Sequence, residues 1–332
     1  MQAWLSSVEW TTAFQIEMLL CTSLVTSKQL CNDLRQPIDN LRVSHPNIIS
    51  DFLRSFAVAL RISSRSGDES PLECFVRLTR ELEEGKLKVG LLTSDEETFC
   101  AHHITLTPTR KVLEGPYPTD SNRVIRAHHG HQDHFIRVDF RDEDLISYRF
   151  GWEVDGEPFL HDCVGKVLKK GFTIAGRDLQ FLGYSTSSLR EHSVWFMHPF
   201  TDSTGNQITV QSIRAALGDF SRLLRTPARY AARLGQAFTA TIPSITVQDD
   251  EIEYVPDLGS HTDGCGTISR ACADEIWETI CKSNPERYSR VLPPSSVSGR
   301  SFPTYIQHLT NICLSIKSAF RDARVWSPLT NI

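Results

Sequence analysis

Apolar residues in the first hundred positions recur at intervals of three and four, which is the spacing of one buried face of an α-helix. In the second of three such segments, Phe52, Phe56 and Leu60 fall on one stripe. A polar, glycine-containing break, Ser63–Ser70, separates the second segment from the third. The pattern therefore predicts a helical N-terminal region over residues 1–100, with helices at Thr11–Leu30, Pro46–Ile62 and Pro71–Glu84.

Beyond residue 100 the pattern changes to short apolar runs, which are typical of strands. Asp155-Gly156 suits a tight turn, so a hairpin is predicted between Tyr148–Val154 and Glu157–Leu160. Pro158 would confine the second of these strands to a sheet edge. The other predicted strands are Ile104–Leu106, Phe135–Phe140, Leu179–Tyr184, Val194–Met197 and Ile252–Val255.

Helical spacing returns in the second half of the chain. A helix is predicted from about Thr209, with one apolar stripe that ends at Leu224, and Thr226-Pro227 provides a cap and first position for the next helix. Ser188–Glu191 fits a capping box. Near the C-terminal end, the predictions are a helix from Ser269 to Lys282, a Pro/Ser linker at Pro293–Gly299 and an amphipathic helix at Phe302–Val325.

Composition places the chain among ordinary globular proteins. Forty per cent of its 332 residues are hydrophobic and 23% are charged. Its nine cysteines form no CxxC pair, a pattern that favours reduced thiols and an intracellular location, cytoplasmic or nuclear. No apolar run near the N-terminus is long enough to cross a bilayer, and no basic region precedes one, so neither a membrane partner nor a signal peptide is expected.

Charge is distributed unevenly. The whole chain carries −5, yet Gly165–Gly235 holds ten Lys or Arg against four acids, a local balance of +6. Arginines recur every three or four residues at its end, and they would point one way if the two helices were nearly continuous. Such a ridge suits a polyanion, because contacts to phosphates dominate nucleic-acid affinity, although a solvated helix face has the same composition. These arginines are Arg222, Arg225, Arg229 and Arg233.

Two clusters could in principle hold a metal ion. The first, Asp139-Phe-Arg-Asp142-Glu-Asp144, brings four carboxylates close in sequence, but an acidic turn after a strand is the expected interpretation. The second is a run of histidines around Asp133, to which His102 and His103 could add ligands for zinc, against a polar loop as the expected interpretation. Its members are His128, His129, His131 and His134.

Several motifs resemble the eukaryotic RNA-dependent RNA polymerases of RNA silencing, as found in fungi, plants and nematodes. In family order they are LTPTRKVLEGPYPTDSNRVIR (106–126), DHFIRVDFRDED (133–144), FLGYSTSSLREHSVWFM (181–197), the segment from Ile213 to Thr241, and HTDGCGTIS (261–269). The resemblance covers residues 104–273. It implies an α+β fold in which residues 101–290 form the N-terminal part of the polymerase core with an incomplete double-psi β-barrel.

The resemblance also implies an activity for the full-length family: copying of single-stranded RNA templates into double-stranded RNA, with ribonucleoside triphosphates and Mg²⁺. The family's catalytic Asp-x-Asp-Gly-Asp loop does not occur in this sequence, and similarity ends after Leu292–Ser296. Residues 291–332 are therefore predicted to be a linker and helix without a family counterpart. An incorrect gene model, a truncated gene or a fragment would each explain this, and no catalytic or metal-binding residue is predicted for the chain as written.

RNA is the partner predicted for this chain. Two alternatives to a polymerase fragment follow from the same observations, a non-catalytic RNA-binding module and a decayed gene product. Arg190 and Glu191 fit a helix-cap pair or the template path equally, whereas Trp195 and Phe196 are expected to pack in the core, and Asp263, Gly264 and Gly266 to form a turn. The residues predicted to contact the RNA backbone are Lys170, Arg177, Arg190, Arg225, Arg229 and Arg233.

Overall fold

The computed structural model describes residues 2–66, 69–87, 98–223, 225–241, 245–246, 251, 265–283, 285, 296–300 and 311–315. The chain divides into two compact units. The first contains Met1–Leu217 and Leu234–Ala240, and the second contains Gly218–Arg233 and Thr241–Ile332. No helix among the described residues is both long and apolar enough to span a membrane.

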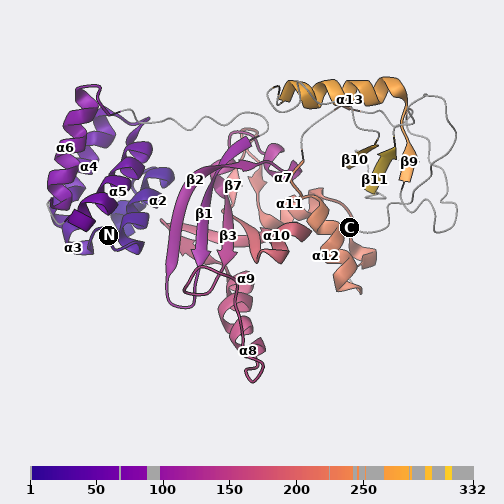
Figure 1. Cartoon of the computed structure of the whole chain (residues 1–332), viewed down its shortest axis with the longest axis horizontal. Helices are drawn as coiled ribbons and strands as arrows, with labels where there is room; N and C mark the ends of the chain where they lie inside the picture. The colour runs from indigo at the N-terminus through magenta and orange to yellow at the C-terminus, as the bar shows by residue number, and fades with distance from the viewer. Residues whose placement is uncertain are drawn as a thin grey trace. The chain divides into compact units, whose positions relative to one another are not determined.

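The first unit begins with the predicted helical region (Figure 1). Its helix α2 ends earlier than predicted, and Thr26 starts a separate turn through a capping box with Gln29. The sequence pattern also missed α4, in which only Ile38 and Leu41 are buried. The helices are α1 (Gln2–Leu5), α2 (Trp10–Cys21), α3 (Ser27–Gln29), the π-helical turn η1 (Leu30–Leu34), α4 (Arg35–Ser44), α5 (Ile49–Ser66) and α6 (Pro71–Glu83).

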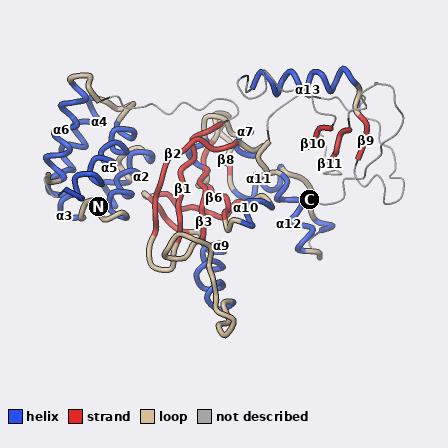
Figure 2. The backbone as a smooth tube through the Cα atoms, in the orientation of Figure 1, coloured by secondary structure: helices blue, strands red, loops and turns tan. Residues whose placement is uncertain are grey.

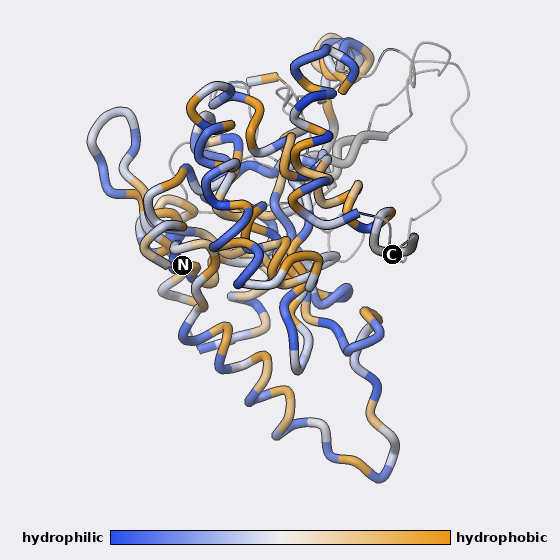
Figure 3. The backbone as a smooth tube through the Cα atoms, turned by 90° about the vertical axis from the view of Figure 1, so that its left-hand side faces the viewer, coloured by the Kyte–Doolittle hydropathy of each residue, from blue (hydrophilic) through white to orange (hydrophobic). Residues whose placement is uncertain are grey.

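Aromatic packing holds these helices together. Phe75 of α6 meets Phe52 and Phe56 of α5 edge-to-face, with ring centroids 5.2 and 5.3 Å apart. All three side chains are fully buried, and edge-to-face pairs add about 0.5–1.5 kcal/mol to area burial. Hydrophobic and hydrophilic positions alternate along the helices that face the viewer in Figure 3, as one buried stripe per helix requires.

A six-stranded sheet in the order β2-β1-β3-β6-β5-β4 follows the helices. β1 and β3 pair in parallel and the other neighbours pair antiparallel. The strands predicted at Ile104–Leu106, Phe135–Phe140, Leu179–Tyr184 and Val194–Met197 are confirmed, and with the helices they make the fold α+β. The bounds are β1 (Thr98–Leu106), β2 (Lys111–Asp120), β3 (Phe135–Phe140), β4 (Phe172–Ile174), β5 (Arg177–Gly183) and β6 (Ser193–Met197).

The sheet and the N-terminal helices share one hydrophobic core. Trp10 and Phe14 of α2 contact the ring of His102 on β1, with centroid distances of 4.8 and 4.5 Å. Residues 101–106 therefore belong to the same cooperative unit as the helices that precede them.

Buried His102 makes the stability of this unit sensitive to acid. Neither ring nitrogen has a hydrogen-bond partner among the described residues, and burial lowers the pKa of His102 to about 3. The unfolded chain takes up this proton near pH 6.5, so the free energy of unfolding should fall as the pH drops from about 6.5 towards 3, by roughly 2 kcal/mol at pH 5.

The variant His102→Phe tests this account. Urea titrations across this range should show that its free energy of unfolding depends less steeply on pH than that of the wild type. An equally steep dependence in the two proteins would contradict this account.

The predicted hairpin at residues 148–160 is wrong. Between β3 and β4 the chain instead forms α8 (Glu157–Leu160), the π-helical turn η3 (His161–Gly165) and α9 (Lys166–Lys170), which project from the sheet (Figure 1). Pro158 sits in the first turn of α8, a position that tolerates proline. The aromatic rings of Tyr148, Phe150 and Phe159 pack against one another, so long-range contacts decide this segment rather than its turn chemistry.

Helix caps after β5 also differ from prediction. Ser185, not Ser188, caps α10 (Thr186–Arg190), and Ser188 lies inside that helix. Thr209 caps α11 (Val210–Ala216) as predicted, but this helix does not reach Leu224 because Gly218 adopts a φ of +132°. A 3₁₀ turn, η4 (Ser221–Leu223), and then α12 (Pro227–Gln236) follow, the latter with its predicted start. Short elements complete the first unit: α7 (Arg123–Arg126), η2 (Gln132–His134), β7 (Phe200–Thr201) and β8 (Gln207–Ile208).

The second unit contains α13 (Arg270–Ser283), which confirms the helix predicted after Ser269. Its three-stranded sheet has the order β10-β11-β9. Two predictions are wrong here, since part of the predicted linker is strand β10 and part of the predicted helix Phe302–Val325 is strand β11, each pairing with a neighbouring strand. The strand predicted at Ile252–Val255 and the residues Asp263 and Gly264 lie outside the described residues. The strand bounds are β9 (Cys265–Thr267), β10 (Ser296–Arg300) and β11 (Asn311–Ser315).

Candidate functional site

A cavity of about 460 Å³ lies in the first unit over the central strands, where His103, Arg137 and Trp195 pair in one row across the sheet. Each of β1, β3 and β6, which are side by side in the sheet (Figure 2), contributes one lining residue, and β2 contributes three. Four of the segments that resemble family motifs converge on it, although they are far apart in sequence. The lining residues are His103, Pro118, Thr119, Asp120, Asn122, Arg137, Ser185, Ser187, Ser188, Glu191, Trp195, Phe238 and Ala240.

Asn122 fixes one wall of this polar cavity. Its Oδ1 accepts a hydrogen bond from the backbone N–H of Ile125 at 3.1 Å and so caps the short helix α7. Its backbone pairs with Ala240 as an isolated bridge, which brings the segment after α12 to the end of β2. Because Asn122 is only 1% exposed, replacing it would remove a buried cap and open this wall.

Three serines form a second wall. The Oγ of Ser185, which is 3% exposed, lies 3.0 Å from the Oγ of Ser187 and 2.7 Å from the Oγ of Ser188. It also accepts a hydrogen bond from the Ser188 N–H at 3.1 Å. The serine cluster is thus preorganised around a buried cap, and hydroxyls of this kind can both donate and accept hydrogen bonds.

Arg137 on β3 ties the two neighbouring strands to the cavity. Its Nε donates to the Ser193 Oγ at 2.7 Å, and its Nη2 lies 3.3 Å from the Glu191 carboxylate. The same guanidinium lies 3.7 Å from Asp139. Its charge is therefore already balanced by carboxylates within the fold.

The charge of the cavity lining is not that of a phosphate site. Asp120 and Glu191 contribute two carboxylates against the single guanidinium of Arg137. Burial, with a further contribution from Arg137, lowers the pKa of His103, so this ring is neutral at pH 7. The lining carries a net charge of about −1 at neutral pH, which favours an uncharged or hydroxyl-bearing group over an anion.

The floor of the cavity is apolar. Trp195 and Phe238 are 5% and 3% exposed, and Trp195 packs against Phe99 with ring centroids 5.8 Å apart. A Cβ atom at Gly183 would collide with the Phe238 ring, so glycine allows this close approach. Trp195 therefore belongs largely to the core, as the sequence predicted.

The structure separates the predicted RNA-contacting residues by burial. Lys170 ends α9 and is exposed. Arg177 begins β5 with only 18% of its side chain exposed, and its Nη1 donates to the Asp133 carboxylate and carbonyl, each at 3.0 Å. Its guanidinium also lies 4.5 Å from the centre of the Trp10 ring. Arg177 is thus held by contacts within the fold.

The other predicted residues lie on two helices. Arg190 is exposed at the end of α10. Arg225 and Arg229 are exposed and Arg233 is half-buried, and the last two are four residues apart on α12, hence on one side of that helix. α11, η4 and α12 are separate elements, so the continuous ridge envisaged from the sequence does not form.

Neither candidate metal cluster forms in the part of the chain that the structure describes, where no group of three or more His, Cys, Asp or Glu could hold an ion. Glu143 pairs with Arg110 at 3.3 Å and accepts from the Thr109 N–H. His131 and His134 pack on Phe200, with ring centroids 4.7 and 4.6 Å away. These residues therefore do not fit the divalent metal that the family resemblance implies.

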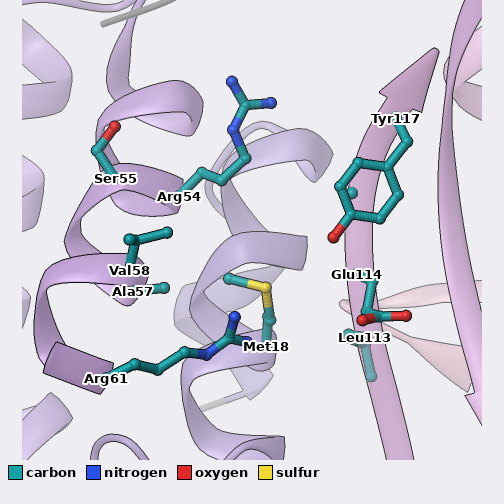
Figure 4. Close-up of a pocket in the computed structure, with 10 residues that line it drawn as sticks. Met18, Arg54, Ser55, Ala57, Val58, Arg61, Leu113, Glu114 and Tyr117 are labelled. Atoms are coloured by element: carbon teal, nitrogen blue, oxygen red, sulfur yellow. The ribbon is translucent and has the colours of Figure 1, made fainter. Parts of the chain in front are cut away.

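A second cavity, of about 200 Å³, lies between α5 and β2. Figure 4 shows Tyr117 and Glu114 of β2 facing Arg54 and Arg61 of α5, with Met18 between them. Arg54 is paired with Asp51 at 2.9 Å. None of these residues was predicted as a site residue, and the cavity is smaller than most ligand pockets.

The comparisons with known proteins concern the same segments. The family model for RNA dependent RNA polymerase matches residues 106–307, more than half of the chain. The chain belongs to this family. The match includes every lining residue of the polar cavity except His103, and it runs beyond Leu292–Ser296, where the motif resemblance ends.

Similar proteins include RNA-dependent RNA polymerase 1 of Arabidopsis thaliana, 35% identical over 212 residues, which is 59% of this chain and 18% of that protein. RNA-dependent RNA polymerase 1 of Schizosaccharomyces pombe is 30% identical over 252 residues, 73% of this chain and 19% of that protein. The chain therefore spans about a fifth of the length of these relatives. Among solved structures, the RNA dependent RNA polymerase QDE-1 from Thielavia terrestris aligns with 96% of this chain and 34% of its own, at 13% identity and a TM-score of 0.49.

The sequence reasoning considered Glu191 for the template path but missed most of the other residues that the polar cavity brings together. Asp120, Asn122 and Arg137 all stand inside motifs that resemble the family, and so do Ser185–Glu191. One feature of the sequence could have indicated these lining residues, namely that polar residues interrupt otherwise apolar motifs at several separate places. Basic charge drew attention to arginines instead, although the lining of this cavity is net acidic.

Proposed function

We propose that the whole protein is an RNA-dependent RNA polymerase of RNA silencing, which copies an RNA template with ribonucleoside triphosphates into double-stranded RNA in the cytoplasm or nucleus. This chain supplies RNA-binding surfaces of the polymerase core, which by the family resemblance includes part of a double-psi β-barrel. The observation that carries the proposal is the family match over residues 106–307, within which separate motifs meet at one polar cavity.

The described residues contribute no metal site, so we derive no chemical step from them. Mg²⁺ would serve nucleotidyl transfer by activating the attacking hydroxyl and stabilising the leaving group. By this proposal its ligands belong to the catalytic loop that resembling proteins carry and this chain lacks. Binding and orienting RNA are what remain for the present residues.

Charge on α12 and the turn before it should supply much of the salt-dependent affinity. Changing Arg225, Arg229 and Arg233 together to Glu removes up to three phosphate contacts, each worth about 0.7 in the slope of log K against log salt for single-stranded RNA. We expect fluorescence anisotropy with a labelled single-stranded RNA at several salt concentrations to show the slope reduced by about 2 in the triple variant.

A matched control changes three exposed basic residues of the N-terminal helices, Lys28, Arg61 and Arg80, to Glu. The net charge changes equally, so a slope reduced as much in the control would show a general charge effect. An unchanged slope in the α12 variant would exclude these arginines as phosphate contacts, and no RNA binding by the wild type would contradict the proposed function.

A further inference from the structure

The polar cavity lined by Asp120, Arg137 and Glu191 has the wrong charge for a phosphate group. Its one guanidinium is engaged by Glu191 at 3.3 Å and by Asp139 at 3.7 Å. A phosphodiester inside would lie near the carboxylates of Asp120 and Glu191, and repulsion between these negative charges costs free energy. If RNA occupies this cavity, the occupying part is therefore the uncharged sugar and base.

The hydrogen-bonding groups of the cavity match a hydroxyl. The carboxylates of Asp120 and Glu191 can only accept, whereas one of the hydroxyls of Ser187 and Ser188 can donate, because the Ser185 hydroxyl donates to one of them and accepts from the other. A ribose 2′-hydroxyl is both a donor and an acceptor, and it distinguishes RNA from DNA. Glu191 is 64% exposed, so its carboxylate retains free acceptor positions beside its ion pair with Arg137.

Size and shape agree with one nucleoside. A volume of about 460 Å³ lies within the usual range for small-molecule pockets. Pro118 is exposed and offers apolar surface for the sugar carbons or a base face, and Trp195 and Phe238, 5% and 3% exposed, border the cavity. The cavity thus combines an apolar floor with a few polar groups that can fix orientation.

Positive charge stands beside the cavity rather than in it. Ser187, Ser188 and Glu191 face the cavity from one side of α10, as residues three and four apart do. Arg190, three residues after Ser187, lies on the flank of this face and is exposed. A strand with its sugar in the cavity would place a neighbouring phosphate near the rim, within reach of a cation.

We infer that this cavity binds one ribonucleoside unit of an RNA strand and recognises its 2′-hydroxyl, with Asp120 and Glu191 as acceptors and one of Ser187 and Ser188 as the donor. The inference rests on the proposed function and adds a specific contact to it. It assigns discrimination between RNA and DNA to the motif residues Ser187–Glu191 and to Asp120.

The test measures affinities of the chain for three single-stranded oligonucleotides of one sequence: RNA, 2′-O-methyl RNA and DNA. A hydrogen bond to a charged acceptor contributes about 1.5 kcal/mol or more. We therefore expect RNA to bind about tenfold more tightly than DNA. The 2′-O-methyl RNA should bind like DNA because it cannot donate this hydrogen bond.

The double variant Asp120→Asn, Glu191→Gln keeps the shapes of both side chains and weakens both acceptors. Its RNA-to-DNA affinity ratio should fall to between one and three. The control Glu153→Gln, Asp155→Asn neutralises two exposed acids in the loop between β3 and α8, so it should shift both affinities together and leave the ratio unchanged. Thermal unfolding of each variant verifies that the fold is retained.

Each outcome has one meaning. A ratio that falls in the cavity variant and not in the control supports the inference. A wild-type chain that binds RNA and DNA equally, or a cavity variant with the wild-type ratio, overturns the inference while the proposed RNA-binding function stands. A wild-type chain that binds neither nucleic acid overturns the proposed function and the inference with it.

Discussion

Gly171→Ala is expected to lower the free energy of unfolding by roughly 3–5 kcal/mol, because the turn between α9 and β4 has a backbone conformation that favours glycine at this position. Gly171 has φ +72° and ψ −168°, a region that is essentially restricted to glycine and costs other residues about 1–3 kcal/mol. A Cβ atom at this position would also overlap the carbonyl oxygen of Leu179 on the partner strand β5, and such overpacking costs about 1–3 kcal/mol more. Urea denaturation followed by circular dichroism measures the change.

Gly205→Ala separates these two costs. Gly205 also has a positive φ, +85°, but an added Cβ would meet nothing within 4 Å. It should therefore cost only the conformational part, about 1 kcal/mol. Equal losses in the two variants would show that contact between Gly171 and Leu179 does not limit this site.

Arg177→Ala is expected to destabilise the fold by about 2 kcal/mol and to leave the salt dependence of RNA binding unchanged. The substitution removes the bond to Asp133, which is 37% exposed, and the contact with the Trp10 ring. The loss is smaller than the 3–5 kcal/mol typical of a fully buried pair, because solvent screens the exposed carboxylate. Thermal and urea unfolding give the stability, and anisotropy with labelled RNA gives the slope.

Lys170→Ala is the matched control, since Lys170 precedes β4 and is exposed. It should leave stability within about 0.5 kcal/mol of the wild type. A stable Arg177→Ala variant with a reduced salt slope would instead assign Arg177 to the RNA surface, as the sequence predicted.

The sequence predicted the fold well where one pattern decides the local structure. Apolar spacing located α5 and α6, and capping residues located the starts of α11 and α12. It failed where packing between side chains, which a local pattern does not encode, decides the structure. Asp155-Gly156 has the chemistry of a hairpin turn, yet packing of Phe150 against Phe159 favours a helix at Glu157–Leu160.

The candidate site was harder to predict than the fold, for a related reason. A count of charged residues identifies arginines as candidates for binding RNA. It cannot show that Arg177 forms an ion pair with Asp133, which lies 44 positions away in the sequence. A polar cavity is assembled by strand order, and the parallel pairing of β1 with β3 is not visible in a local pattern. The lining residues of the cavity could be recognised only from knowledge of which motifs, distant in sequence, lie together in the fold.

The strand order has a kinetic consequence. β3 lies in the middle of the sheet, where Ile136 pairs with His102 on one side and with Phe196 on the other. Other strands separate both β1 and β6 from β3 in the sequence. The chain therefore loses loop-closure entropy before the contacts of the central pairing can stabilise the sheet. During synthesis, the helices up to Glu83 emerge before β6, and we expect the sheet to assemble on them only after Met197 has left the ribosome.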